Sequence, residues 1–233
     1  MSNSTDPALA HAPHPVEVVQ PTVSAAPPTR VRAANAARSV LHVGAALMAL
    51  VLLRALPTRS WQIAVSAAVA MAGWTMEISR RKSPAVNARV MALFAPVAHP
   101  HEHHGINSAT WYVTAVFLLT LFAERSAAEL GVVVLGIADP AAALIGRRFG
   151  RTRLRANRSL EGTLGFVVVG ALAAGAWLRF ACALPTPLMA LLSVSSGVAG
   201  ALTELVSTRL DDNFTIPVVV SAAVSAAQLL AAA

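Results

Sequence analysis

The chain has 233 residues, of which 56% are hydrophobic and 12% are charged, and its formal net charge is +7. Several apolar stretches approach the roughly 20 residues that a helix needs to cross a bilayer, so the composition excludes an ordinary soluble domain. The positive charge does not indicate nucleic-acid binding, because the arginines lie in short loops beside apolar segments, as in the topology signal of membrane proteins. Cys182 is the single cysteine, which excludes an intramolecular disulfide.

The N-terminal segment, 1–35, is rich in Pro, Ala, Ser and Thr and contains no long apolar run. Such a composition buries too little apolar surface to offset the loss of chain entropy on folding. We therefore expect residues 1–35 to form a disordered cytoplasmic tail.

The remainder of the chain alternates between apolar segments and polar loops. Seven segments are predicted to be membrane helices: 39–56, 61–79, 110–123, 127–145, 163–183, 188–207 and 214–231. A shorter segment, 88–98, is ambiguous. If it crosses the membrane, the positively charged loops are split between the two sides. If it is re-entrant or interfacial, most of these loops lie on the cytoplasmic side, as the positive-inside rule expects. We therefore expect an all-α membrane helix bundle of about seven spans plus one re-entrant or interfacial segment, with most acidic residues in its cytoplasmic half.

Asp139 interrupts the apolar span 127–145 and is followed by Pro140, which removes a backbone donor from the helix. An acid at this depth is costly unless it is paired or binds a cation. Two interpretations remain open, namely a functional carboxylate and an internal ion pair with one of the arginines.

The loop after this span indicates a phosphate site. Gly146 and Gly150 flank Arg147, and such glycines allow a tight turn with backbone N–H groups close to a ligand. The six arginines from Arg147 to Arg158 offer forked donors for phosphate oxygens, although some of them serve as a positive-inside signal. Ser159 is predicted to cap the next helix, whose N-terminus provides a second anion site.

Acidic residues near the last span indicate a metal site. Asp211, Asp212 and Asn213 supply the hard oxygen ligands that Mg²⁺ prefers. Glu204 lies seven residues before Asp211, so the two share a face if the helix continues. Glu204 is interpreted as a metal ligand, a proton acceptor or the partner of an arginine.

Two further patterns lie on predicted helices. Arg38 and His42 are four residues apart and share one face, where His42 either binds nucleotide or only caps the helix. Glu77 has Arg80 and Arg81 at i+3 and i+4, an arrangement that favours a structural salt bridge over catalysis.

Three segments occur together in this order: "ADPAAALIGRRFG", "NRSLEGTLGF" and "ELVSTRLDDNFTIPVVV". With "RSVLHVG" and "HEHHGINSATWY", they resemble the membrane-embedded CTP-dependent lipid kinases, a family that includes polyprenol (dolichol) kinase, phytol kinase and fungal CTP-dependent diacylglycerol kinase and is similar to CDP-diacylglycerol synthases. The resemblance extends from about Arg38 to the C-terminus. It implies that residues 36–233 form a membrane-embedded kinase domain, which transfers the γ-phosphoryl group of CTP to a lipid alcohol with a divalent cation.

One position departs from the family pattern. The family usually has Lys-Ser-x-Glu-Gly where this chain has Arg158, Ser159, Leu160, Glu161 and Gly162. Arginine is a forked donor and lysine a point charge, so this replacement changes a phosphate contact and bears on the nucleotide preference that the resemblance implies.

Residue chemistry and resemblance together predict one site at the inner leaflet of the cell membrane. The predicted catalytic residues are Asp139, Glu102 and Glu204. The predicted nucleotide-binding residues are Arg38, His42, Gly146, Arg147, Gly150, Asn157, Arg158, Ser159, Glu161 and Gly162. The predicted Mg²⁺ ligands are Asp139, Asp211, Asp212 and Asn213. The expected partners are a membrane lipid alcohol, a nucleoside triphosphate and the bilayer.

Three alternatives remain. A cytidylyltransferase that forms a CDP-lipid uses similar residues but attacks the α-phosphate. A transporter of an anionic substrate also keeps charges inside the membrane, although the sequence shows no internal repeat of the kind that many transporters have. A purely structural membrane subunit is the third.

Overall fold

The structure is a computed structural model that describes residues 28–95, 105–154, 158–208 and 210–232, with backbone only before residue 36. Its helices are α1 (Pro28–Ala55), α2 (Arg59–Lys82), α3 (Pro84–Phe94), α4 (Ser108–Phe122), α5 (Arg125–Phe149), α6 (Leu160–Ala181), α7 (Thr186–Val206) and α8 (Asp212–Ala232). Within the described ranges, the extended pairing consists of one isolated bridge between Arg153 and Ser159. The all-α prediction is therefore confirmed.

The structure supports five of the seven predicted membrane spans. Five helices are long and apolar enough to cross a membrane, namely α1 from Ala36, α5, α6, α7 and α8. Helix α4 is apolar but has only 15 residues, and α2 carries Glu77 and three basic residues in its last turns. The seven predicted segments all form helices, but seven spans are not confirmed.

Helix α3 occupies most of the ambiguous segment 88–98. Its 11 residues extend for about 16 Å, roughly half of the 30 Å hydrocarbon core. The end of α2 and the start of α4 also lie together, because Arg80 at the end of α2 donates to the carbonyl of Gly105 just before α4. The chain therefore returns to the same end of the bundle after α3, as expected for a segment that does not cross.

The helix starts follow local capping chemistry. Side-chain oxygens of Thr58, Ser83, Asn107 and Ser159 accept backbone N–H groups of the first turns of α2, α3, α4 and α6. The predicted Ser159 cap is confirmed, with Gly162 N as its donor. Helix α1 begins at Pro28, inside the predicted tail, and residues 1–27 lie outside the described part of the chain.

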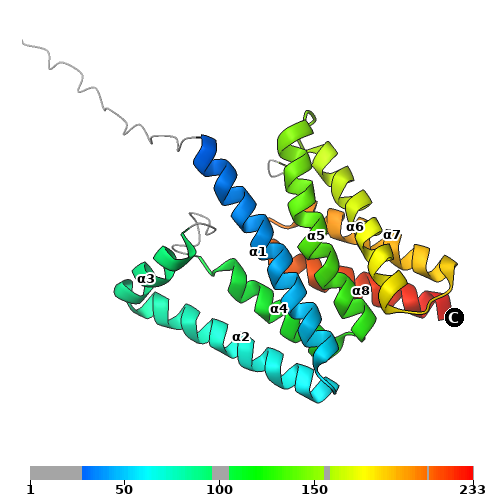
Figure 1. The fold of residues 1–233 in the computed structure, drawn as a ribbon, viewed down its shortest axis with the longest axis horizontal. Coiled ribbons are helices and arrows are strands. Elements are labelled where there is room, and N and C mark those ends of the chain that lie inside the picture. The colour runs from blue at the N-terminus through cyan, green and yellow to red at the C-terminus, as the bar shows by residue number, and fades with distance from the viewer. Residues whose placement is uncertain (1–27, 96–104, 155–157, 209, 233) are drawn as a thin grey trace, which may run out of the picture.

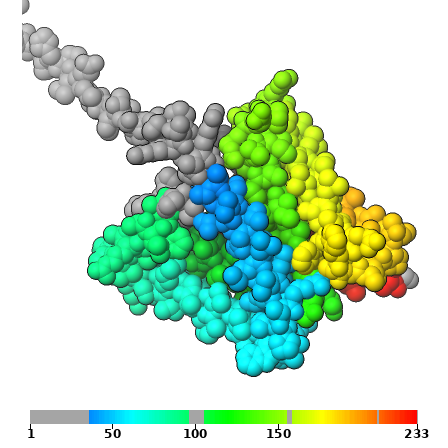
Figure 2. All heavy atoms as spheres, in the orientation of Figure 1, coloured from blue at the N-terminus to red at the C-terminus, as the bar shows by residue number. Residues whose placement is uncertain are grey.

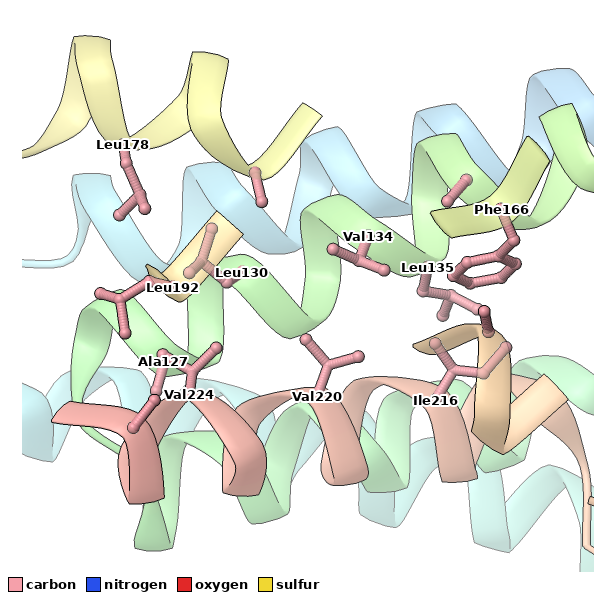
Figure 3. Close-up of a cluster of buried hydrophobic side chains, with 14 of the residues drawn as sticks. Ala127, Leu130, Val134, Leu135, Phe166, Leu178, Leu192, Ile216, Val220 and Val224 are labelled. Carbon is pink, nitrogen blue, oxygen red and sulfur yellow. The ribbon is translucent and has the colours of Figure 1, made fainter. Parts of the chain in front are cut away.

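Helix α5 lies at the centre of the fold, and 61% of its most apolar 18-residue stretch is buried. Leu130 and Val134 of α5 pack with Phe166 of α6 and Val220 of α8 (Figure 3). At Gly131, an added Cβ would lie 2.4 Å from the carbonyl oxygen of Pro217 in α8. The absent side chain therefore permits close contact between α5 and α8.

Figure 1 shows that helices joined by short turns point in different directions. Helices α1 and α2 separate from their common turn, and α5 and α6 form an antiparallel pair that projects at one end. On the face shown in Figure 2, α1 lies between the α2 and α3 pair and the α5 and α6 pair. The middle of α1 thereby approaches the C-terminal half of α5, where His42 of α1 lies 3.8 Å from Asp139.

A polar cluster joins α1, α5 and α6 near the opposite end. The carboxylate of Glu129, which is fully buried, accepts Nε and Nη2 of Arg54 at 2.8 and 2.7 Å and the indole N–H of Trp177 at 2.9 Å. The guanidinium of Arg54 also lies 5.4 Å from the centroid of the Trp177 ring. These contacts satisfy a buried charge from two neighbouring helices and fix their relative positions.

Candidate functional site

A cavity of 390 Å³, lined by both acidic and basic side chains, lies between α1, the C-terminal part of α5 and the start of α8. Its lining includes the predicted site residues Arg38, His42, Asp139, Arg147, Arg158, Asp211, Asp212 and Asn213. We refer to it as the acidic cavity, because three aspartates line it: Asp139 of α5, Asp211 just before α8 and Asp212 at the start of α8.

A second cavity of 330 Å³ lies between α5, α6 and the end of α7. Its lining includes Gly146, Arg147, Arg153, Arg158, Ser159, Gly162, Thr163 and Glu204, and we refer to it as the basic cavity. Ala143, Arg147 and Arg158 line both cavities, so the two adjoin at these side chains. The structure thus brings predicted residues from five helices and two loops to one end of the bundle.

Arg158 connects the two cavities through ion pairs. Its Nη1 lies 2.7 Å from Oε1 of Glu204, and its Nη2 lies 2.5 Å from Oδ2 of Asp212. Glu204 is nearly completely buried, whereas Arg158 and Asp212 are partly exposed. A buried carboxylate requires such a partner, so Glu204 fixes Arg158 in the position where both cavities meet.

Two aspartate side chains retain acceptor capacity. Oδ1 of Asp212 is buried without a hydrogen-bond partner. Oδ2 of Asp139 lies 3.8 Å from Nδ1 of His42, which is longer than a hydrogen bond. A buried oxygen without a donor is unfavourable by about 1–3 kcal/mol, and such groups indicate a further ligand.

The carboxylate of Asp211 is held by its neighbours. Its Oδ2 accepts the Ser108 hydroxyl at 2.6 Å, and its Oδ1 accepts the backbone N–H and the Nδ2 of Asn213 at 2.9 and 2.8 Å. These bonds connect the start of α4 to the start of α8 and fix the direction of the carboxylate.

The acidic cavity fits Mg²⁺ only in combination with a substrate. Among the described residues, no three His, Cys, Asp or Glu side chains are placed to hold one metal ion by themselves. Mg²⁺ commonly binds through one or two carboxylates, with water and substrate phosphates as its other ligands. The available oxygens of Asp139 and Asp212 match that pattern.

The glycines have a packing role that the sequence interpretation missed. A Cβ added to Gly146, Gly150 or Gly162 would lie 3.0, 2.8 or 3.1 Å from Oγ of Ser159. The N–H of Gly150 donates to the Gly146 carbonyl, and the N–H of Gly162 donates to Ser159. These two N–H groups are therefore already hydrogen-bonded within the protein and are not free to bind a ligand. The glycines instead leave space for Ser159, which lets α6 pack against α5.

Other predicted residues lie away from the cavities or outside the described residues. Gly150 and Glu161 line neither cavity, and the Glu161 carboxylate accepts the backbone N–H of Thr152 at 3.1 Å in the preceding loop. Glu102 and Asn157 fall outside the described residues. The predicted turn at Gly146 is wrong, because α5 continues to Phe149 and carries Arg147 and Arg148 in its last turn. Arg147, Arg153 and Arg158 line the cavities, whereas Arg148 contacts the Phe149 ring and Arg151 lines neither cavity.

Sequence reasoning did not select Ser108 or Thr163. Ser108 follows the N-cap Asn107 of α4, where a serine is ordinary helix-start chemistry, and only the tertiary structure places its hydroxyl on Asp211. Thr163 lines the basic cavity with a buried hydroxyl that has no partner. Its position next to Gly162 in the segment "LEGTLGF" was the available signal.

Comparison with known proteins supports the resemblance noted in the sequence. The chain is 26% identical over 167 residues to CTP-dependent diacylglycerol kinase 1 of Saccharomyces cerevisiae, an alignment that covers 63% of this chain and 57% of the relative. The chain therefore matches little more than half of the length of that relative. No family model and no solved structure matches the chain. The similarity confirms the predicted resemblance to CTP-dependent lipid kinases.

Proposed function

We propose that this protein is a membrane-embedded kinase that transfers the γ-phosphoryl group of a nucleoside triphosphate, CTP, to the hydroxyl of a membrane lipid alcohol. The observation that carries the proposal is the junction of a basic and an acidic cavity at Arg147 and Arg158. Phosphoryl transfer requires positioning and charge stabilisation more than covalent chemistry by the protein, and these two cavities provide both kinds of charge.

The basic cavity is the proposed site of the phosphate chain. Arg147, Arg153 and Arg158 present guanidinium groups to it, and the first turn of α6 begins at its wall. Guanidinium groups match phosphate oxygens in geometry and charge, and a helix N-terminus adds a partial positive charge. We assign Arg38 and His42 to the nucleotide as well, because they line the adjoining acidic cavity.

The acidic cavity is the proposed site of the metal and of the reacting hydroxyl. Asp139 and Asp212 would hold Mg²⁺, with Asp211 and Asn213 beside them. Mg²⁺ held by these residues would neutralise charge on the phosphate oxygens. The available carboxylate oxygens described above support this assignment.

The acceptor hydroxyl oxygen forms the new bond to the γ-phosphorus, and the bond between that phosphorus and the β–γ bridging oxygen breaks. The nucleoside diphosphate leaves, and the hydroxyl proton passes to a carboxylate of the site. We favour Asp139 over Glu204 as the acceptor of this proton, because Oε1 of Glu204 is already paired with Arg158. Glu102 is a further proposed catalytic residue on sequence grounds alone.

The name of the relative favours diacylglycerol as the first acceptor to test, followed by polyprenol and phytol-like isoprenoid alcohols. The hydroxyl of such a lipid lies near the membrane surface, at the end of the helices where the acidic cavity is located. We place this end on the cytoplasmic side of the cell membrane, because the arginine-rich loop between α5 and α6 belongs to it.

The test uses purified full-length protein in lipid nanodiscs with Mg²⁺, each lipid alcohol and CTP labelled on the γ- or the α-phosphate. The proposal expects γ-label in the lipid phase and CDP in the aqueous phase. Transfer of α-label with pyrophosphate release would instead identify a cytidylyltransferase. Absence of transfer from CTP, ATP, GTP and UTP to every alcohol would reject the kinase proposal, and a nucleotide-independent anion flux would support a transporter.

A further inference from the structure

A buried ion pair lies outside both cavities, near the end of α2. Nε and Nη2 of Arg80 lie 2.9 Å from Oε2 and Oε1 of Glu77, and both side chains are only 1% exposed. A buried pair of this kind contributes little net stability relative to apolar residues of similar size, but it holds its surroundings in one arrangement when its remaining donors and acceptors are used.

The remaining donors of Arg80 and the remaining acceptor of Glu77 bind α3 and the segment just before α4. Arg80 donates from Nη1 to Oδ1 of Asn87 in α3 at 3.0 Å and from Nη2 to the carbonyl of Gly105. Oε2 of Glu77 accepts the backbone N–H of Asn107 at 3.3 Å. The pair therefore fixes the backbone that leads into α4.

This backbone leads directly to the acidic cavity. Asn107 is the N-cap of α4, and its Oδ1 accepts the N–H of Ala109 at 2.8 Å. The next residue, Ser108, lines the acidic cavity and donates its hydroxyl to Oδ2 of Asp211 at 2.6 Å. A displacement of Asn107 would therefore move the Ser108 hydroxyl and, through its hydrogen bond, the Asp211 carboxylate.

We infer that Glu77 and Arg80 are positioning residues for Asp211, and that they act through Asn107 and the Ser108 hydroxyl. The inference rests on the proposed function in one respect, namely that Asp211 belongs to the site of the metal and nucleotide. Groups behind metal ligands typically change metal affinity or activity by about 10–100-fold when they are removed, because the ligands lose their orientation. Binding sites tolerate displacements of only about 0.5 Å, so a small movement at the start of α4 is sufficient.

Arg81 provides a matched control. Its Nε lies 2.6 Å from Oε1 of Glu77, but its side chain is 48% exposed and faces the surface side of the pair. Arg81→Gln removes a charged partner of Glu77 and leaves the Arg80 contacts to Gly105 and Asn87 in place. A general effect of charge at Glu77 would appear in this variant, whereas an effect through α4 would not.

The experiment compares wild type with Glu77→Gln, Arg80→Met, Ser108→Ala, Arg81→Gln and the double variant Glu77→Gln with Ser108→Ala, all as full-length protein in nanodiscs. Calorimetry measures the Kd for Mg–CTP, transfer assays measure the Mg²⁺ concentration at half-maximal rate, and thermal melting reports folding. We expect the first three variants to raise both binding quantities by about 10–100-fold. We expect Arg81→Gln to remain within about twofold of wild type, because Arg80 still pairs with both oxygens of Glu77 and the half-exposed Arg81 adds little to that pair.

The double variant separates positioning from general destabilisation. Residues that act in one chain of contacts are non-additive, so the double variant should be no weaker than the weaker single variant. Ser108→Ala is expected to melt like wild type, which keeps the test valid if Glu77→Gln fails to fold. Wild-type binding by Ser108→Ala, or fully multiplicative effects in the double variant, would overturn the inference.

The two proposals fail in different ways. If wild type transfers phosphate and the three variants match it in binding, the positioning inference is rejected and the kinase proposal remains. If wild type binds Mg–CTP without transferring phosphate and the variants bind more weakly, the kinase proposal is rejected and the positioning inference remains. Absence of Mg–CTP binding by folded wild type rejects both.

Discussion

Arg158 holds Glu204 through a 2.7 Å ion pair at the point where the acidic and basic cavities meet. The same guanidinium also pairs with Asp212, so a single cation balances two carboxylates from different helices. A bound nucleotide would bring phosphate oxygens that compete with these carboxylates for Arg158, while the proposed metal would replace the guanidinium as the partner of Asp212. Arg158 is therefore the side chain whose substitution separates the possible roles of the site most directly.

Arg158→Gln should lower kcat/KM for transfer from CTP by at least about 100-fold, because it removes a charge that stabilises the transferring group. Arg158→Lys should lose no more than about tenfold, since an ammonium keeps the point charge but contacts fewer oxygens. Steady-state transfer assays with labelled CTP measure both values. Equal loss in the two variants would mean that the forked geometry, rather than the charge, is essential.

Glu204→Gln distinguishes an anchor from a general base. If Glu204 only holds Arg158, the KM for the nucleotide should rise while kcat falls by less than about tenfold. If Glu204 accepts the hydroxyl proton, kcat should fall by about 10²–10⁴-fold with little change in KM. The geometry favours the first result, and the separate kcat and KM values from initial-rate measurements decide between them.

Asp139→Asn should abolish measurable transfer while the protein remains folded. The substitution removes the negative charge that we assign to the metal and the hydroxyl proton, but it keeps nearly the same volume. Because a carboxylate inside an apolar helix is costly, the melting temperature in nanodiscs should be unchanged or higher than that of wild type. A large drop in melting temperature with retained transfer would instead indicate a structural ion pair.

The Arg54 and Glu129 cluster gives the opposite expectation, because it lies away from both cavities. Arg54→Met leaves the fully buried Glu129 carboxylate without its cation and should lower the free energy of unfolding by about 3–5 kcal/mol. Glu129→Gln should have a smaller effect, since Arg54 is 38% exposed and its charge is able to reach water. Denaturant titration in mixed micelles measures both changes. The KM of the remaining folded protein for CTP should stay at the wild-type value.

Much of the helical pattern was predictable because helix formation depends on local sequence. The apolar segments, the Ser159 cap and the short segment near α3 follow from composition, capping chemistry and length. The convergence of Asp139, Arg158 and Asp212 at one end follows from the alternating direction of successive helices. Which helices cross the membrane was less predictable. Segments 61–79 and 110–123 were predicted to cross, but the helices they form, α2 and α4, do not combine the length and the apolarity that a span requires.

Which residue types gather at one end of the bundle could be read from the residues alone, because each membrane-spanning helix carries the chain to the opposite end and so fixes where the next loop lies. Their partners depend on how the helices pack: Arg158 pairs with Glu204 and Asp212, and Ser108 pairs with Asp211. The same holds for the glycines, which make room for Ser159 in place of a ligand. Such contacts depend on helix rotation and on distances of a few ångströms between segments far apart in the chain, and neither quantity is present in a pattern of residue types.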